Sequence, residues 1–299
     1  MRPPTGEQIE ITSGDQAAVV VEAGGGLRSY SAGGHELLDG FAADEMPRSS
    51  RGKVLVPWPN RIRDGSYEFG GESHQLPIDE LARGNAIHGL ARWAAWSVAE
   101  REQHRVLMRL AIHPRPGYPF ALTVEVEYAL SPEGLRVITT ATNAGDRACP
   151  YGCGAHPYLT LGTDSINELT LQAPAATVLI ADERDIPVGS EPVEGTEFDF
   201  RRPRPIGGTV LDHAFTDLER GEDGLARVIL SDAERAVELW LDAAYGHLML
   251  FTGDVPHVGR RGLAVEPMSC PPNAFQSGEG LIRLEPGAAV SAAWGIRPS

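Results

Sequence analysis

Five short segments of this chain bring together histidine, carboxylate, arginine and turn residues between apolar runs. The side chains in them that could bind a ligand or transfer a proton are Asn60, Arg61, His88, His156, Asp212 and Glu266. An imidazole exchanges protons near neutral pH, and a carboxylate can take a proton from one side of a substrate while an imidazole gives one to the other. These residue types therefore suit a pocket that transfers protons without a metal ion or an organic cofactor.

Several common catalytic signatures are missing from the sequence. No His-x-x-x-His pair is present, and no Gly-x-Ser-x-Gly elbow or Gly-x-x-x-x-Gly-Lys-[Ser/Thr] loop occurs. Gly24, Gly25 and Gly26 form a run without dinucleotide-binding spacing. The three cysteines, Cys149, Cys153 and Cys270, predict neither a disulfide framework nor a structural zinc site. Metal-dependent, nucleotide-dependent and serine-hydrolase chemistry all lack their markers.

The elements that must position these residues are predicted to be strands. From Phe120 to Leu130 apolar and polar residues alternate strictly, which is the period of a half-buried strand. The Ser131–Gly134 sequence (SPEG) then predicts a tight turn, followed by a return strand over Leu135–Asn143. Further strands are predicted at Arg105–His113, Asn167–Gln172, Leu225–Leu230, Ala236–Asp242, His247–Thr252 and Ala288–Ile296, with a hairpin joining Tyr67–Phe69 to His74–Leu76.

The fold class follows from these strands and from the lack of helical patterns. No window of helical length carries an apolar stripe free of glycine and proline. Successive antiparallel strands with short turns predict an all-β sandwich or barrel, here as a single domain over residues 1–299. The stretch Ala181–Gly208 is rich in proline, glycine and charged residues, and this composition predicts a long surface loop.

Charge and composition limit the partners. The 26 basic and 41 acidic residues give a net charge of −15, which repels nucleic-acid phosphates and anionic lipids. The one basic run, Arg201–Pro205, reads as a solvated loop. No apolar stretch is long enough to span a membrane, and the first residues contain no signal-peptide core, so a cytoplasmic location is expected. The expected partner is a small molecule, with the chain acting as a monomer or homodimer.

Taken together, the segments resemble the aldose 1-epimerase (galactose mutarotase) family, in particular a bacterial branch of it. The similarity follows nearly the whole chain in the family's order. It rests on Pro57–Phe69 (PWPNRIRDGSYEF), His74–Glu80 (HQLPIDE), Asn85–Gly89 (NAIHG), Trp93–Trp96 (WAAW), Gly154–Leu159 (GAHPYL), Pro187–Pro203, Leu211–Phe215 (LDHAF) and Ala264–Pro267 (AVEP).

The resemblance implies a fold and a reaction. The fold is the large antiparallel β-sandwich of the galactose mutarotases, with few short helices. The reaction interconverts the α and β anomers of a free sugar and needs no cofactor. By the matching motifs, Glu266 would be the base at the C1 hydroxyl, His156 the acid at the ring oxygen and His88 a group that polarises this oxygen. Arg61 and Asp212, with Asn60 beside them, would hold sugar hydroxyls.

Some features depart from the family pattern and leave alternatives open. Leu159-Thr160 stands where Phe-Asn often follows the His-Pro-Tyr motif, and His213 follows Asp212, so that galactose is not assumed to be the sugar. An epimerase of phosphorylated or sulfonated sugars would need extra cations, for which Arg63, Arg83 and Arg92 are candidates. A non-catalytic sugar sensor, or a lyase or hydrolase on the same architecture, are further alternatives.

Other aromatic and histidine residues receive structural interpretations. Trp58, Trp93 and Trp96 could stack on a sugar, but they are predicted to be buried core residues. His74, His113 and His257 match no catalytic role and are predicted to be surface or core histidines.

Overall fold

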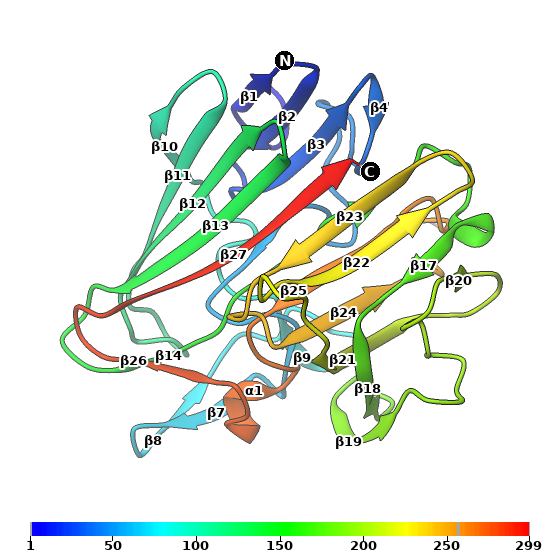
Figure 1. Cartoon of the computed structure of the whole chain (residues 1–299). Helices are drawn as coiled ribbons and strands as arrows, with labels where there is room; N and C mark the ends of the chain where they lie inside the picture. The colour runs from blue at the N-terminus through cyan, green and yellow to red at the C-terminus, as the bar shows by residue number, and fades with distance from the viewer. Residues whose placement is uncertain (1, 256–257, 299) are drawn as a thin grey trace.

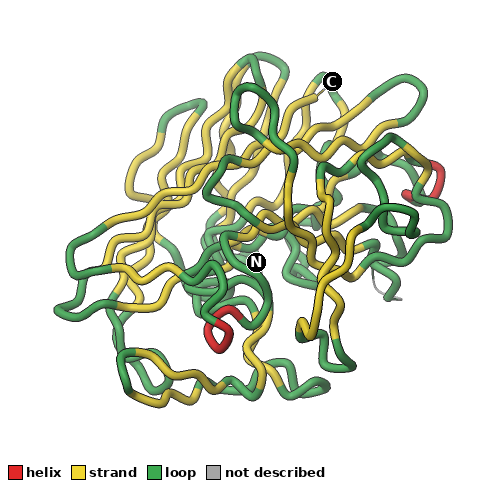
Figure 2. The backbone as a smooth tube through the Cα atoms, turned by 60° about the horizontal axis from the view of Figure 1, so that its bottom comes forward, coloured by secondary structure: helices red, strands yellow, loops and turns green. Residues whose placement is uncertain are grey.

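The computed structural model describes residues 2–255 and 258–298, and its regular secondary structure is almost entirely strand (Figure 2). In this part of the chain the helical elements are η1 (Ile166–Glu168) and α1 (Ala274–Ser277). The scarcity of helix confirms what the residue patterns predicted.

The larger of two main sheets has nine strands, which form the upper layer in Figure 1. Its order is β10 (Ser97–Arg101), β11 (Arg105–Ile112), β12 (Leu122–Ser131), β13 (Gly134–Asn143), β27 (Ala289–Pro298), β23 (Ala236–Leu241), β22 (Ala226–Ser231), β17 (Thr170–Gln172) and β20 (Arg204–Pro205). The predicted hairpins β12–β13 and β22–β23 are confirmed, with antiparallel register.

The second main sheet has eight strands and lies below the first in Figure 1. Its order is β19 (Pro187–Pro192), β18 (Ala175–Ala181), β21 (Asp212–Leu218), β24 (His247–Phe251), β25 (Leu263–Met268), β15 (Gly154–Ala155) and β5 (Val54–Leu55), with β16 (Tyr158–Leu159) also paired to β25.

Smaller sheets complete the fold. They are the four-stranded β1 (Gln8–Ser13), β2 (Gln16–Val21), β3 (Leu27–Ala32) and β4 (His35–Glu36), and the pairs β6 (Arg61–Arg63) with β9 (Asn85–Ile87), β7 (Ser66–Phe69) with β8 (Glu72–Gln75), and β14 (Cys149–Tyr151) with β26 (Ile282–Leu284). The β7–β8 hairpin confirms its prediction.

The core lies between the two main sheets. One continuous cluster of buried apolar side chains draws Val126 and Val137 from the upper sheet and Leu248 and Val265 from the lower one. Along β12 burial alternates residue by residue, because successive side chains of a strand point to opposite faces. The expected antiparallel sandwich is therefore confirmed.

The outer face of the eight-stranded sheet is also covered. Every residue of β25 is buried, although successive residues face opposite ways. On the outer face Met268 joins a small apolar cluster with Leu179, Ala214 and Met249. Side chains on this face of β25 consequently lie in a covered, water-poor environment rather than on open surface.

Three sequence expectations need correction. Residues 166–168 form the turn η1, which the Ser165 hydroxyl caps by accepting from the Asn167 amide, so that this strand begins only at Thr170. The Ala181–Gly208 stretch is not wholly loop, because β19 and β20 form within it. Proline is tolerated in β19 because it is an edge strand. The sequence interpretation also placed no strand in residues 8–36, where β1–β4 lie.

The described residues also bear on the cysteine and membrane expectations. Cys149, Cys153 and Cys270 are all buried and unpaired. Within residues 2–255 and 258–298, no helix has the length and apolar character needed to cross a bilayer.

Candidate active site

Glu266 sits in the middle of β25 on the outer face of the eight-stranded sheet. Strand alternation places Val265 in the sandwich core and turns Glu266 the other way. In the register of β24 and β25, Met249 is the residue opposite Glu266. Glu266 is 2% exposed, and its Oε2 atom has no hydrogen-bond partner among the described residues.

His156 approaches Glu266 from the neighbouring chain segment. It lies between β15 and β16, which pair with β25 through Gly154 with Met268 and Tyr158 with Ala264. The Pro157 carbonyl accepts a hydrogen bond from the Val265 amide, which ties the two segments together beside Glu266. The His156 ring stacks on the Tyr158 ring at an interplanar angle of 9°.

His88 is held by a turn at the end of β9. Its φ of 60° lies in the left-handed region, and its backbone N–H donates to the Asn60 carbonyl. Gly89 follows with φ 72°, and a Cβ there would lie 2.1 Å from the Val56 oxygen. Only glycine fits this close approach, so Gly89 fixes the path that brings His88 into the site.

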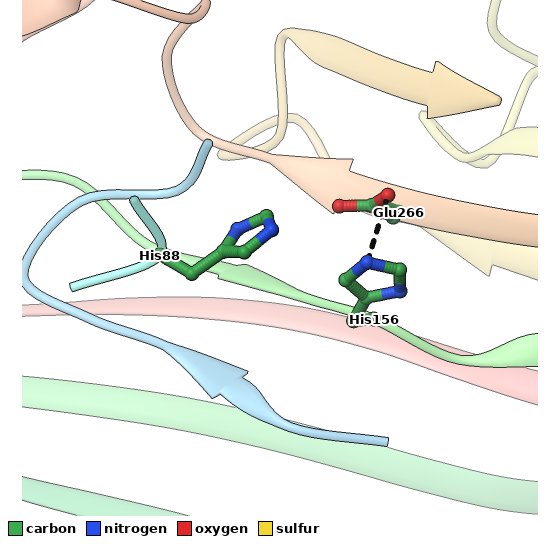
Figure 3. Close-up of side chains that lie close together, drawn as sticks. All are labelled: His88, His156 and Glu266. Atoms are coloured by element: carbon green, nitrogen blue, oxygen red, sulfur yellow. Dashed lines mark ion pairs between the residues drawn. The ribbon is translucent and has the colours of Figure 1, made fainter. Parts of the chain in front are cut away.

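The three side chains meet in one buried cluster (Figure 3). His156 Nε2 lies 3.3 Å from Glu266 Oε1. The His88 and His156 rings pack edge to face with centroids 5.3 Å apart. The structure thus brings these three side chains together, although the residues lie 68 and 110 positions apart along the chain.

Burial pushes the pKa values of the two proton-transfer groups in opposite directions. It raises the pKa of Glu266 well above its usual 4.5, and the Asp212 carboxylate adds to this effect. It lowers the pKa of His156 to about 3, with Arg51 and Arg92 contributing. Both shifts favour uncharged forms. The two shifts therefore favour a neutral imidazole beside a protonated carboxyl group.

The His88 ring is neutral for the same reason. Burial lowers its pKa well below 6.5, and His156, Arg92 and Arg61 add to this effect. A neutral ring can donate one hydrogen bond and accept another, which suits a group that polarises an oxygen.

Arg61 lies at the start of β6, paired there with Ile87 of β9. Its Nε and Nη2 atoms donate to the two oxygens of Glu80, both at 2.9 Å, and Nη2 also lies 3.1 Å from Asp185 Oδ2. Within the described part of the chain, its Nη1 atom makes one long hydrogen bond, of 3.4 Å, to Asn60 Oδ1. Glu80 and Asp185 thus form a clamp on the Nε and Nη2 side of the guanidinium, whereas Nη1 has no hydrogen bond to a carboxylate among the described residues.

Asp212 begins β21, two strands from Glu266. Asp212 is half-buried, and desolvation raises its pKa, while the Arg61 guanidinium counteracts that rise. Its charge also acts on Glu266. The structure thus groups Asp212 electrostatically with Arg61 and Glu266, without a direct hydrogen bond between it and either one in the described residues.

Two acids of this site were missed by the sequence interpretation. Glu80 ends the His74–Glu80 motif, but no role was predicted for it. Asp185 lies in the stretch interpreted as a surface loop, at a φ of 57° that few residues adopt. Arg83 Nε lies 2.6 Å from Asp185 Oδ2 and so secures it. No local pattern marks Asp185, because its partners come from distant segments.

The extra cations considered for an anionic sugar are each paired with a carboxylate. Arg63 pairs with Asp182, Arg83 with Asp185, and Arg92 with Asp79. Their charges are consequently compensated in the structure.

The remaining aromatic and histidine expectations have mixed outcomes. Trp58 and Trp96 are buried as expected, but Trp93 is 49% exposed, and the core interpretation is wrong for it. His74 packs against aromatic rings, and His113 is exposed. His257 lies outside the described residues. His213 accepts a hydrogen bond from the Asp212 amide through Nδ1.

Comparison with known proteins identifies the group to which the chain is related. The sequence model of the aldose 1-epimerase family matches residues 7–297. The chain belongs to the aldose 1-epimerase family.

Individual relatives support this assignment. An uncharacterised Escherichia coli protein, YihR, is 37% identical over 284 residues, which cover 95% of this chain and 90% of that protein. Human galactose mutarotase is 30% identical over 168 residues, covering 54% of this chain and 48% of the human protein.

Solved structures show the same fold. A galactose mutarotase-like protein from Clostridium acetobutylicum superposes with a TM-score of 0.86 at 18% identity, over 98% of this chain and 95% of that one. Galactose 1-epimerase from Lactobacillus acidophilus superposes with a TM-score of 0.81 at 22% identity, over 100% and 97%. The fold class expected from the aldose 1-epimerase resemblance is confirmed.

Replacing Asp185 by asparagine tests the clamp on Arg61 in this aldose 1-epimerase family member. Asparagine tolerates the left-handed backbone, so that the fold should persist while one charged contact to Arg61 is lost. We expect KM for the sugar to rise about 3- to 10-fold, equivalent to about 1 kcal/mol, with kcat nearly unchanged. Steady-state kinetics measure both constants.

Asp217→Asn is the matched control, because Asp217 also has a positive φ (55°) but hydrogen-bonds to Thr177 instead. It should leave KM unchanged. A fall in kcat at constant KM for Asp185→Asn would show that Asp185 acts on the chemical step and not on substrate binding.

Proposed function

We propose that this protein is an aldose 1-epimerase that interconverts the α and β anomers of a free aldose by acid–base catalysis. The observation that carries the proposal is the buried pair of His156 Nε2 and Glu266 Oε1, 3.3 Å apart with His88 beside it. Family membership supports the reaction class. Proton transfer alone balances the reaction, so the proposed isomerase uses no cofactor.

The proton balance can be followed atom by atom. Glu266 takes the proton of the C1 hydroxyl while the bond from C1 to the ring oxygen breaks. His156 gives a proton to that oxygen, with His88 polarising it. The open aldehyde turns about the C1–C2 bond and recloses on its other face, with the two roles reversed. Each positioned group contributes about 10²- to 10⁴-fold in rate.

The resting pair reaches its working form without exchanging a proton with solvent. With the proton on Glu266 both groups are neutral, which burial favours. Transfer of that proton to His156 Nε2 creates a carboxylate base and an imidazolium acid in one step. The polar sugar, and the charges of Arg61 and Asp212, would offset part of the cost of separating these charges.

Arg61, Asp212 and Asn60 would hold the sugar in this arrangement. The clamped guanidinium offers Nη1 as a donor, and the Asp212 carboxylate accepts hydroxyl protons. A fixed substrate geometry contributes to catalysis by removing the entropy cost of alignment at the moment of reaction.

Anomer exchange measured by NMR saturation transfer tests the proposal. A panel of free hexoses, pentoses and acidic sugars is compared between the wild type and Glu266→Gln. Exchange above the buffer rate that disappears in the variant supports the epimerase. Sugar binding without exchange would replace it by the sensor alternative, and activity confined to acidic sugars would favour the anionic alternative. Turnover of an oligosaccharide would favour the lyase or hydrolase.

The cytoplasmic location, the single domain and the oligomeric state stay predictions.

The pH dependence of kcat/KM should reflect the shifted pKa values. A second proton enters the pair only as the pH falls toward the His156 pKa of about 3, because burial opposes the imidazolium. The only proton leaves at a pH well above the usual glutamate range. We expect kcat/KM to stay level from about pH 7 to about pH 5, whereas an ordinary histidine acid would titrate near 6.5. A limb near pH 6.5 would contradict this assignment.

Met249→Gln provides the comparison for this profile. An amide donor opposite Glu266 would favour the carboxylate and lower its pKa, which should move the alkaline limb to lower pH. Met249→Leu keeps the position apolar and should leave that limb in place.

A further inference from the structure

The cluster of His88, His156 and Glu266 also has the composition of a transition-metal site. All three residues are buried, and one donor atom from each lies within 4.8 Å of the other two. Two imidazoles and one carboxylate form a ligand set that suits zinc, and catalytic zinc sites use three protein ligands with water in a fourth position.

The spacing of the donors already matches one edge of a tetrahedral site. Bonds of about 2.1 Å to a tetrahedral ion place neighbouring donors about 3.4 Å apart. His156 Nε2 and Glu266 Oε1 are 3.3 Å apart. The distances from the His88 donor atom to the other two donors must also come to about 3.4 Å, which requires a shift of the His88 ring. In the described residues no hydrogen bond restrains its Nδ1 atom, so that such a shift breaks no contact at this atom.

We propose that His88, His156 and Glu266 bind a divalent transition metal such as Zn²⁺, and that the bound ion inhibits the enzyme. His156 Nε2 and Glu266 Oε1 would coordinate the metal, and these are the atoms that proton transfer requires. Sugar and metal would therefore compete for one site. The inhibition rests on the proposed function, whereas the binding does not.

Cobalt(II) is the probe for binding, since it takes tetrahedral sites like those of zinc and absorbs visible light when bound. Metal-free full-length protein is titrated with Co²⁺, and Zn²⁺ is then added in competition. We expect one bound ion per chain, visible ligand-field bands of a four-coordinate site, and displacement by Zn²⁺ but not by Mg²⁺. No saturable band, or a strong near-ultraviolet band from thiolate ligation, would overturn the proposal.

Three single variants locate the ion. Glu266→Gln, His156→Asn and His88→Asn should each weaken Co²⁺ binding about 10-fold or more, as loss of a ligand does. His247→Asn is the matched control, because His247 is another buried imidazole of the same sheet and pairs with Glu279 instead. If all three site variants bound Co²⁺ with the affinity of the wild type, the metal would lie elsewhere and the proposed site would be wrong.

Steady-state kinetics test whether the bound metal inhibits the enzyme. Zn²⁺ should raise the apparent KM for the sugar without lowering kcat. Metal binding with undiminished anomer exchange would overturn the inhibition. Metal binding by a protein that shows no exchange even when metal-free would count against the proposed function while leaving the metal site standing.

Discussion

Glu266→Gln is expected to lower kcat for anomer exchange by about 10³-fold or more, because glutamine cannot accept the C1 hydroxyl proton. The substitution keeps the size and shape of the side chain. The His156 ring, the β25 register and the apolar neighbours should therefore stay in place, and KM should change little. Saturation-transfer NMR on the preferred sugar measures the loss.

The stability of this variant separates loss of chemistry from loss of fold. Burial raises the folded-state pKa of Glu266 above the unfolded value near 4.5, so the folded protein holds that proton more tightly. This contribution to stability is complete below pH 4.5 and is lost as the pH rises toward the folded-state pKa. Glutamine has no proton to lose, so the Tm of the variant at neutral pH should equal or exceed that of the wild type.

Glu279→Gln is the control, because Glu279 pairs with His247 and not with His156. It should retain full activity. If Glu266→Gln retained wild-type exchange, the assignment of the base would be wrong, however well the fold matched the aldose 1-epimerase family.

His156→Asn is expected to lower kcat by about 10²- to 10³-fold, because the ring oxygen loses its proton donor. Asparagine is small and polar, and it cannot reach Glu266 as the imidazole does. The carboxyl group should then lose the acceptor that converts it into an active base. The same NMR assay gives the size of the effect.

The double variant Glu266→Gln with His156→Asn tests whether the two residues act as one unit. If the proton must pass between them, removing either one disables both, and the double variant should be about as slow as the slower single variant. If the fold-loss of kcat in the double variant equalled the product of the two single losses, the two residues would act independently. His247→Asn should leave the rate unchanged.

The outcome for the strands shows where local sequence suffices. Phe120–Leu130 and its partner were predicted because alternation, a proline–glycine turn and β-branched residues all agree there, and β12 and β13 confirm them within a few residues. By contrast, β19 was missed because its prolines and glycine obscure an edge strand. Its pairing with β18 depends on a partner strand and not on its own composition.

The sequence by itself determined the fold class, the family and the residues to examine, because each of these depends on short patterns read in chain order. Only the tertiary structure decided how those residues work together. It brings one residue of β25, one from the segment between β15 and β16 and one from the turn after β9 within 4.8 Å, and it adds Glu80 and Asp185 as the clamp on Arg61. It also shifts their pKa values. Burial, which no motif records, lowers the pKa of His156 to about 3 and raises the pKa of Glu266 well above 4.5, because a water-poor environment penalises every unpaired charge.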